Sequence, residues 1–184
     1  MDDDARLERL RLSGGSSGEL VQAWGLLTMA CGGRPVEQSQ DAVDRLRDYN
    51  YYNGNSYGRF HLIREERDQS VNIAGVTHSA WFDDGVVLNA IAIRPESRSQ
   101  GLGARAIVTL AEIATKRGLS EMWLYAHPNS ALQKFYRKLG FKALPDNDYR
   151  VDPATTSPCI PLVARVSRVA EVPLKYLLLS GDIL

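Results

Sequence analysis

The chain has 184 residues, 44% of them hydrophobic, and its 22 basic residues balance its 22 acidic ones. This balance excludes a strong overall field, so neither nucleic acid nor an anionic membrane is expected as a partner. Length and apolar content predict a single domain over residues 1–184, with 1–18 as a flexible start and 169–184 as an apolar tail. The acidic start is unlike a signal peptide and no apolar run approaches the length of a membrane span, so a cytoplasmic protein is expected.

The predicted elements follow the spacing of apolar residues and the positions of turn residues. Seven strands are expected, at residues 5–12, 58–65, 71–82, 86–94, 121–126, 141–149 and 160–167. Four helices are expected, at residues 20–31, 36–48, 101–117 and 130–139. Short polar turns join the three strands between residues 58 and 94, which is typical of an antiparallel meander. The predicted fold class is α/β (α+β), with helices packed on one mixed sheet.

Residues 49–57 are rich in tyrosine and asparagine and are predicted to form a loop. They are too polar for a core segment and too aromatic for a plain linker. Two interpretations stay open: the loop faces a substrate, or its tyrosines pack their rings while the hydroxyls stay in water.

Residues 91–104 read IAIRPESRSQGLGA, an apolar strand end followed by a polar loop and two glycines that open a helix. The first turn of a helix leaves its amides without intrahelical acceptors and carries the positive end of the helix dipole. Gly101 and Gly103 allow the backbone to approach a ligand closely, and Arg98 adds a permanent cation. The pattern indicates a cradle for a phosphate-bearing ligand.

The spacing of the two glycines matches neither of the common glycine loops. A P-loop requires Lys and then Ser or Thr after its last glycine, where this chain has Ala104 and Arg105. A dinucleotide fingerprint requires a third glycine, and Ala106 and Ile107 occupy its region. An isolated pair of glycines can also serve only to shape a tight turn between a strand and a helix, so a second motif has to decide.

The second motif lies in residues 129–141, which read NSALQKFYRKLGF. Residues 98–104 resemble the R/Q-x-x-G-x-G/A pyrophosphate loop of the GNAT (Gcn5-related N-acetyltransferase) superfamily, and residues 129–141 resemble its N-x6-Y-x3-G-F motif. The two motifs occur in the order and at the separation of that family. The resemblance covers about residues 57–168, and no individual member is recognised.

The resemblance implies a GNAT-like, mostly antiparallel sheet of about seven strands with about four helices, in which the strands of Ile91 and Leu124 run parallel and splay apart at the cofactor site. It also implies an acetyl-CoA-dependent N-acetyltransferase, in which a primary amine of a small molecule, peptide or protein attacks the thioester directly. Acetyl-CoA is then the donor substrate, and no metal is expected. The implied cofactor-binding residues are Ile91, Ala92, Ile93, Arg98, Ser99, Gln100, Gly101, Leu102, Gly103, Ala104, Asn129 and Tyr136.

The resemblance places Tyr136 at the position of the general acid. A phenol is protonated at neutral pH, so it can supply a proton to a departing thiolate. The alternative is that Phe135 and Tyr136 are only core aromatics of a packed helix. A backbone N–H near Ile93, fixed at a strand edge beside a bulge, is the expected donor to the thioester oxygen.

The general base is the least defined group. Residues 86–93 contain no carboxylate, whereas some members of the family carry a glutamate on this strand. His127 is the first side-chain candidate, followed by His78 and Glu65, and an ordered water is the other candidate. The absence of an obvious base favours an acceptor amine of low pKa.

The alternative function is a non-catalytic acyl-CoA-binding module that acts through a protein partner. The segment 172–184 is too apolar to be left in water, so it either covers this domain or docks on a partner, and a homodimer is expected. The sequence leaves the acceptor and the length of the acyl chain open.

Overall fold

The computed structural model describes residues 6–10, 17–31, 39–54, 58–67, 70–126, 130–144 and 160–173. The strands in these ranges are β1 (Arg6–Leu10), β2 (Gly58–Arg67), β3 (Ser70–Trp81), β4 (Gly85–Ile93), β5 (Glu121–Ala126), β6 (Lys142–Ala143) and β7 (Ile160–Arg165). The helices are α1 (Ser17–Cys31), α2 (Ser39–Gly54), α3 (Leu102–Lys116), α4 (Ser130–Lys138), α5 (Val166–Ala170) and the 3-10 turn η2 (Pro95–Ser97).

The seven described strands form one sheet in the order β1-β2-β3-β4-β5-β7-β6. The β4–β5 pair is parallel and the other five pairs are antiparallel. This parallel pair is joined through α3, as a crossover between parallel strands requires. The predicted fold class, a mixed and mostly antiparallel sheet with flanking helices, is confirmed.

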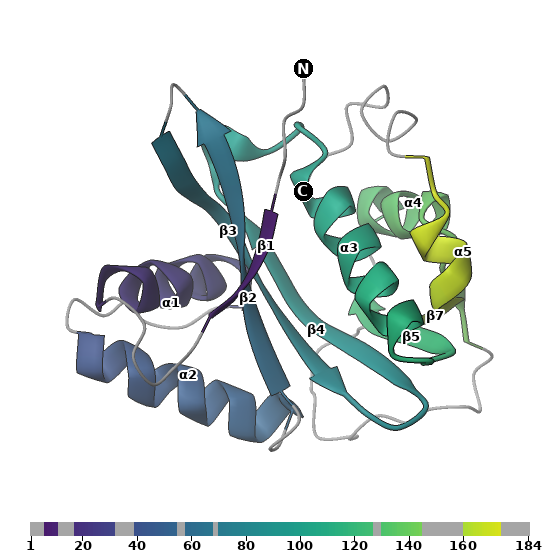
Figure 1. The fold of residues 1–184 in the computed structure, drawn as a ribbon, viewed down its shortest axis with the longest axis horizontal. Coiled ribbons are helices and arrows are strands. Elements are labelled where there is room, and N and C mark those ends of the chain that lie inside the picture. Colours follow the sequence, from purple (N-terminus) through teal and green to yellow (C-terminus); the bar gives the residue numbers. More distant parts are fainter. Residues whose placement is uncertain are drawn as a thin grey trace.

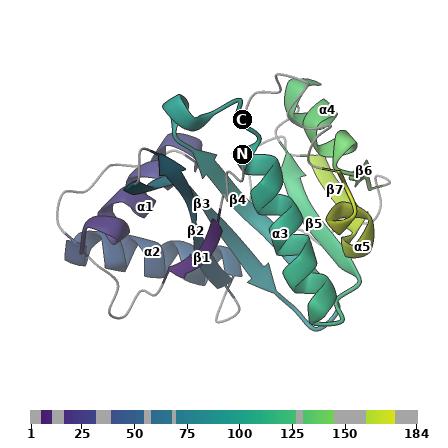
Figure 2. The same ribbon diagram turned by 45° about the horizontal axis from the view of Figure 1, so that its top comes forward.

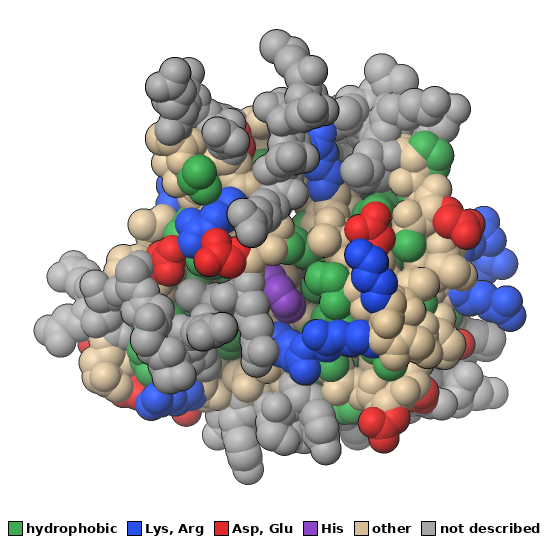
Figure 3. All heavy atoms as spheres, viewed as in Figure 1, with side chains coloured by type: hydrophobic (Ala, Val, Ile, Leu, Met, Phe, Trp, Pro, Cys, Tyr) green, Lys and Arg blue, Asp and Glu red, His purple; other side chains and the backbone are tan. Residues whose placement is uncertain are grey.

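Helices cover both faces of the sheet, and each face has its own hydrophobic core (Figures 1 and 2). Helices α1 and α2 pack on β2, β3 and the second half of β4, through residues such as Leu27, Leu46 and Phe60. Helices α3, α4 and α5 pack on the other face, over β4, β5 and β7, through residues such as Leu110 and Leu124. Figure 3 shows acidic and basic side chains interspersed on one face of the molecule.

The predicted loop at residues 49–57 is wrong over its first part, because α2 continues to Gly54. The Tyr49 ring lies 6.2 Å from the Phe60 ring and 5.1 Å from the His78 ring, measured between centroids. These contacts hold helical backbone where Asn and Gly disfavour it, so tertiary packing overrides local propensity. Residues 55–57 lie outside the described residues.

The segment that begins at β7 also differs from the prediction. The strand expected to run to residue 167 ends at Arg165, and α5 follows at once. Val166 and Val169 are buried, three residues apart on one face of this short helix. The described residues therefore hold five α-helices where four were expected.

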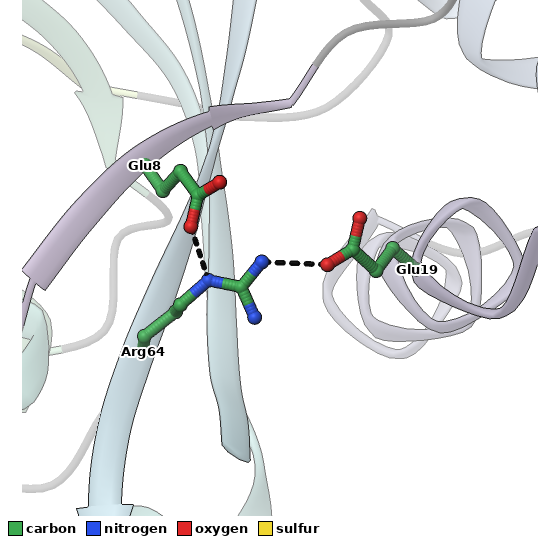
Figure 4. Close-up of polar contacts among 3 residues, drawn as sticks. All are labelled: Glu8, Glu19 and Arg64. Carbon is green, nitrogen blue, oxygen red and sulfur yellow. Dashed lines mark hydrogen bonds and ion pairs between the residues drawn. The ribbon is translucent and has the colours of Figure 1, made fainter. Parts of the chain in front are cut away.

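One polar clamp ties the first strand and first helix to the sheet (Figure 4). Nε of Arg64 on β2 lies 2.5 Å from a carboxylate oxygen of Glu8 on β1, and one Nη lies 2.6 Å from Glu19 on α1. The hydrogen bonds to Glu19 and Glu8 raise the pKa of Arg64. The pair with Glu19 is partly buried, so it is screened less by solvent than the exposed pair with Glu8.

Candidate active site

The loop between β4 and α3 has the backbone shape of an anion cradle. Ser99 and Gly101 both have positive φ, 60° and 74°, so the chain turns sharply before α3 begins at Leu102. A non-glycine residue at positive φ is uncommon and often marks a functional turn. Gly101 is the N-cap residue of α3 and offers no side-chain cap to the first turn.

The amides of this loop lack backbone acceptors among the described residues. The first backbone hydrogen bond of α3 runs from the Arg105 amide to the Gly101 carbonyl, at 2.9 Å. In the described part of the chain, the amides of residues 99–104 donate to no backbone carbonyl. Amides at a helix N-terminus attract anions through their hydrogens and through the helix dipole. These are six of the residues predicted to bind the cofactor.

Side-chain hydrogen bonds attach the segment between β4 and α3 to strands β4 and β2. Nε of Arg98 lies 3.2 Å from the Ile93 carbonyl oxygen, which leaves the Nη edge of the guanidinium to face an anion. The hydroxyl of Ser97, which is buried, donates to Glu65 at 2.8 Å. Glu65, a candidate base in the sequence, is thus a support of the cradle.

The two parallel strands beside the loop, β4 and β5, separate toward their C-terminal ends, as the family resemblance implied. Residues Gly85 to Leu88 pair with Glu121 to Leu124, and the ladder stops there. Beyond it, β4 pairs only with β3 and β5 only with β7 among the described strands. A gap therefore opens between the last halves of β4 and β5, directly below the cradle.

Backbone groups of β4 point into this gap. The Arg94 amide donates to the Ala74 carbonyl of β3 at 2.8 Å. Because successive residues of a strand direct their N–H and C=O groups to opposite sides, Ile93 and Ile91 direct theirs away from β3 and toward the gap. The Ile93 carbonyl accepts from Arg98, whereas both amides and the Ile91 carbonyl have no strand partner among the described residues.

A bulge lies on β4 at the start of the gap. His78 pairs with Ala90 and Ser79 pairs with Leu88, so Asn89 has no opposite residue on β3. The bulge also exchanges the faces of the strand: Leu88 packs under α3, whereas Ala90 packs under α1 and α2. The strand thus contains a bulge, as expected, and it lies four residues before Ile93, whose amide is the expected donor.

A buried histidine connects this bulge to α2. His78 is fully buried; its Nε2 lies 2.8 Å from Oδ1 of Asn50 and its Nδ1 lies 3.2 Å from Nδ2 of Asn89. The Asn50 oxygen can only accept and the Asn89 amide can only donate, which assigns a neutral imidazole with its proton on Nε2. A Cβ at Gly58 would overlap the Asn50 side chain, so glycine is required there.

The His78 ring is a poor candidate for the base, because both nitrogens are engaged. Burial, with a smaller effect from His61, lowers the pKa of His78 to about 4. The folded state thus binds this proton less tightly than the unfolded chain does. Neutral His78 makes its full contribution to the free energy of unfolding above pH 6.5, and this contribution is lost as the pH falls from 6.5 toward 4.

We expect acidification from pH 6.5 to 4 to lower the free energy of unfolding by about 3 kcal/mol through His78. In His78→Gln, which keeps a polar side chain but cannot titrate, this part of the decrease should disappear. Urea unfolding of both proteins at several pH values measures the difference. An identical pH dependence in the variant would remove His78 as its source.

Tyr136 lies on α4, in the core that also contains Leu124 and Ala126 from the end of β5. Its ring makes edge contacts with Phe135 at 5.1 Å and Phe141 at 5.9 Å between centroids. Burial raises the pKa of Tyr136 to about 12, so its phenol is protonated at neutral pH. Both sequence interpretations, core aromatic and proton donor, are compatible with this placement.

His127 and Asn129, predicted as base and as cofactor ligand, lie outside the described residues. Sequence reasoning missed Asn50 and Asn89, which contact His78 from positions 28 and 11 residues away. Contacts between residues so far apart leave no pattern in a short stretch of sequence. The structure also contains no group of three or more potential metal ligands within its described ranges, nor a helix long and apolar enough to cross a membrane.

Comparison with known proteins bears on this arrangement. Residues 25–141 match the model of the acetyltransferase (GNAT) family. The chain belongs to this family. That match covers most of the chain and includes both the cradle and Tyr136, so the family resemblance seen in the two motifs is confirmed.

Among curated proteins, the chain is similar to the thialysine N-epsilon-acetyltransferase of Bos taurus, with 32% identity over 69 residues. The match spans 37% of this chain and 41% of that protein. Two solved structures share the fold of this GNAT chain. A Bacillus subtilis acetyltransferase in complex with CoA has a TM-score of 0.58 at 18% identity, covering 88% of this chain and 99% of that one. A GNAT acetyltransferase from Elizabethkingia anophelis with acetyl-CoA bound has a TM-score of 0.60 at 14% identity, covering 90% and 99%.

Proposed function

We propose that this protein transfers an acetyl group from acetyl-CoA to a primary amine of a small molecule, peptide or protein. The observation that carries the proposal is the gap between β4 and β5, which lies next to a loop whose amides, at residues 99–104, donate to no backbone carbonyl in the described part of the chain. A linear ligand with amide groups along its arm and phosphates at its end fits both parts at once. The two relatives named above with CoA or acetyl-CoA bound support the same donor.

The chain's own residues supply the binding surface for that donor. The amides of residues 99–104 and the Arg98 guanidinium hold the pyrophosphate. The Ile91 carbonyl and amide hydrogen-bond the arm in the manner of an added strand. Bound there, acetyl-CoA supplies an acyl carbon that forms a bond to the amine nitrogen as its bond to sulfur breaks, with one proton lost from nitrogen and one gained by the thiolate.

The Ile93 amide is the proposed donor to the thioester oxygen. It points into the gap, and its strand is held by β3 on the other side, so it is fixed before the substrate arrives. The bulge at Asn89, held by His78, sets which β4 groups face the gap. His78 is in this view a positioning residue and does not contact the reacting atoms.

Tyr136 is the proposed acid for the departing sulfur, because its phenol keeps its proton at all pH values near neutrality. The proton of the amine leaves through water, or through His127 if that side chain reaches the gap. His78 and Glu65 are engaged in the contacts described above and are left out of this step.

The binding-module alternative uses the same cradle but needs no acid. The homodimer expected from the apolar tail stays a prediction, since residues 174–184 lie outside the described residues.

The first test is the melting temperature of the full chain with acetyl-CoA, longer acyl-CoAs, CoA and NAD. A ligand that binds the folded state raises its stability by RT ln(1 + [L]/Kd). We expect a rise with the CoA species and none with NAD, and the acyl chain with the largest rise identifies the donor. An unchanged melting temperature with every CoA species would overturn the proposal.

A further inference from the structure

A cavity of about 440 Å³ lies on the sheet face opposite α3. Its floor is formed by Val87, Trp123 and Tyr125. On β5 these aromatic residues alternate with Met122 and Leu124, which are buried in the core beneath α3. The cavity therefore lies on the same face as α1 and α2, over the strands that those two helices leave uncovered.

The cavity combines aromatic walls with negative charge. Phe82, Trp123 and Tyr125 provide the rings, and Asp84 and Glu121 provide two carboxylates. No Lys or Arg is found among the described residues that line it. Burial raises the pKa of Tyr125, so its phenol adds no charge. Carboxylates with aromatic faces are the surroundings that bind alkylammonium ions, through ion pairing and cation–π contact.

The cavity runs alongside the strand toward the reaction site. Tyr125 is the first residue of β5 beyond the last pair with β4, Leu88 and Leu124, so its end of the cavity borders the gap. Glu121 lies at the opposite end, where β5 begins. Four residues of a strand span about 13 Å, which leaves room for an extended chain of several methylenes with an amine at each end.

We propose that this cavity binds the acceptor, and that the acceptor is an aliphatic amine carrying a second positive charge. The second ammonium lies between Asp84 and Glu121, the methylene chain packs on the aromatic rings, and the reacting amine lies at the Tyr125 end, facing the gap. This inference rests on the proposed acetyltransferase function. It replaces the sequence-based preference for an amine of low pKa, because alkyl diamines are ordinary strong bases that lose their proton only on desolvation.

Kinetics with matched acceptors test the charge preference. Acetyl transfer is measured by release of the CoA thiol for terminal diamines of increasing length. The amino alcohol and the amino acid of each length serve as neutral and anionic analogues. We expect kcat/KM for the preferred diamine to exceed that for its amino alcohol by roughly tenfold or more, and the amino acid to be the poorest acceptor.

The double variant Asp84→Asn with Glu121→Gln removes the charge and keeps the shape. We expect its preference for the diamine over the amino alcohol to fall to about one to threefold, through a higher KM for the diamine, with acetyl-CoA affinity unchanged. Glu112→Gln, which changes an exposed carboxylate on α3, is the matched control and should keep the full preference.

The possible outcomes distinguish a failure of this inference from a failure of the proposed acetyltransferase function. Acetyl transfer to amines without a preference for dications, or with a preference that survives in the double variant, would overturn the inference and leave the acetyltransferase intact. Acetyl-CoA binding without transfer to any amine would overturn both. A variant that no longer folds is recognised by its melting temperature, and the single change Glu121→Gln then gives the same comparison.

Discussion

Tyr136→Phe is expected to lower turnover by about 100-fold or more while leaving the affinity for acetyl-CoA unchanged. The substitution removes only the hydroxyl, and the ring keeps its contacts with Phe135 and Phe141. Without the phenol, the thiolate must leave without a proton donor held beside it. Steady-state kinetics of acetyl transfer and calorimetry with acetyl-CoA measure the two quantities separately.

Phe141→Leu is the control for this experiment, because it loosens the same aromatic cluster without touching the phenol. It should lower stability more than turnover. The pH profile adds a second check. Because the pKa of Tyr136 is raised to about 12, loss of its proton should not limit turnover between pH 6 and 10. Full turnover in Tyr136→Phe would assign the tyrosine to packing alone.

Arg98→Gln is expected to weaken acetyl-CoA binding by about 10- to 100-fold, because a hydrogen bond to a charged group contributes about 1.5–3 kcal/mol. Turnover at saturating donor should change less than the affinity, since Arg98, in the described part of the chain, contacts the reaction site only through its hydrogen bond to the Ile93 carbonyl. Calorimetry at two salt concentrations measures the effect, and the salt dependence of binding should become weaker in the variant.

Lys116→Gln is the matched control, because it removes one positive charge as Arg98→Gln does, from an exposed residue at the far end of the helix that follows the loop. It should leave the dissociation constant unchanged. If both variants bind acetyl-CoA as the wild type does, the loop at residues 98–104 only shapes a turn, and the phosphate must be held elsewhere.

The cradle and its strand could be predicted because their signals are local. Residues 91–104 contain the strand end, the proline and both glycines in one stretch, and the prediction of a helix at 101–117 agrees with α3 within a residue at each end. The strand predicted at residues 121–126 has the observed bounds, since its residues alternate between buried positions under α3 and partly buried positions on the opposite face.

The parts that could not be predicted depend on contacts between distant segments. The last turn of α2 is held by Tyr49 against Phe60 and His78, and the bulge at Asn89 is held by His78. The cavity on the sheet face opposite α3 combines residues from three strands, the turn between β3 and β4, and the segment after β6. None of these arrangements leaves a pattern in a window of neighbouring residues, which is where periodicity is read.

The measurement that tests the account most directly is acetyl transfer by the full chain. The protein is mixed with acetyl-CoA and an equimolar pool of diamines, amino alcohols, amino acids and peptides, and the products are identified by mass spectrometry as CoA thiol is released. We predict one acetyl group on an amine nitrogen, with a diamine as the favoured acceptor, and product lower by about 100-fold or more with Tyr136→Phe over the same time. Acetyl-CoA that binds but stays intact in the presence of every amine would contradict the enzyme and support a binding module.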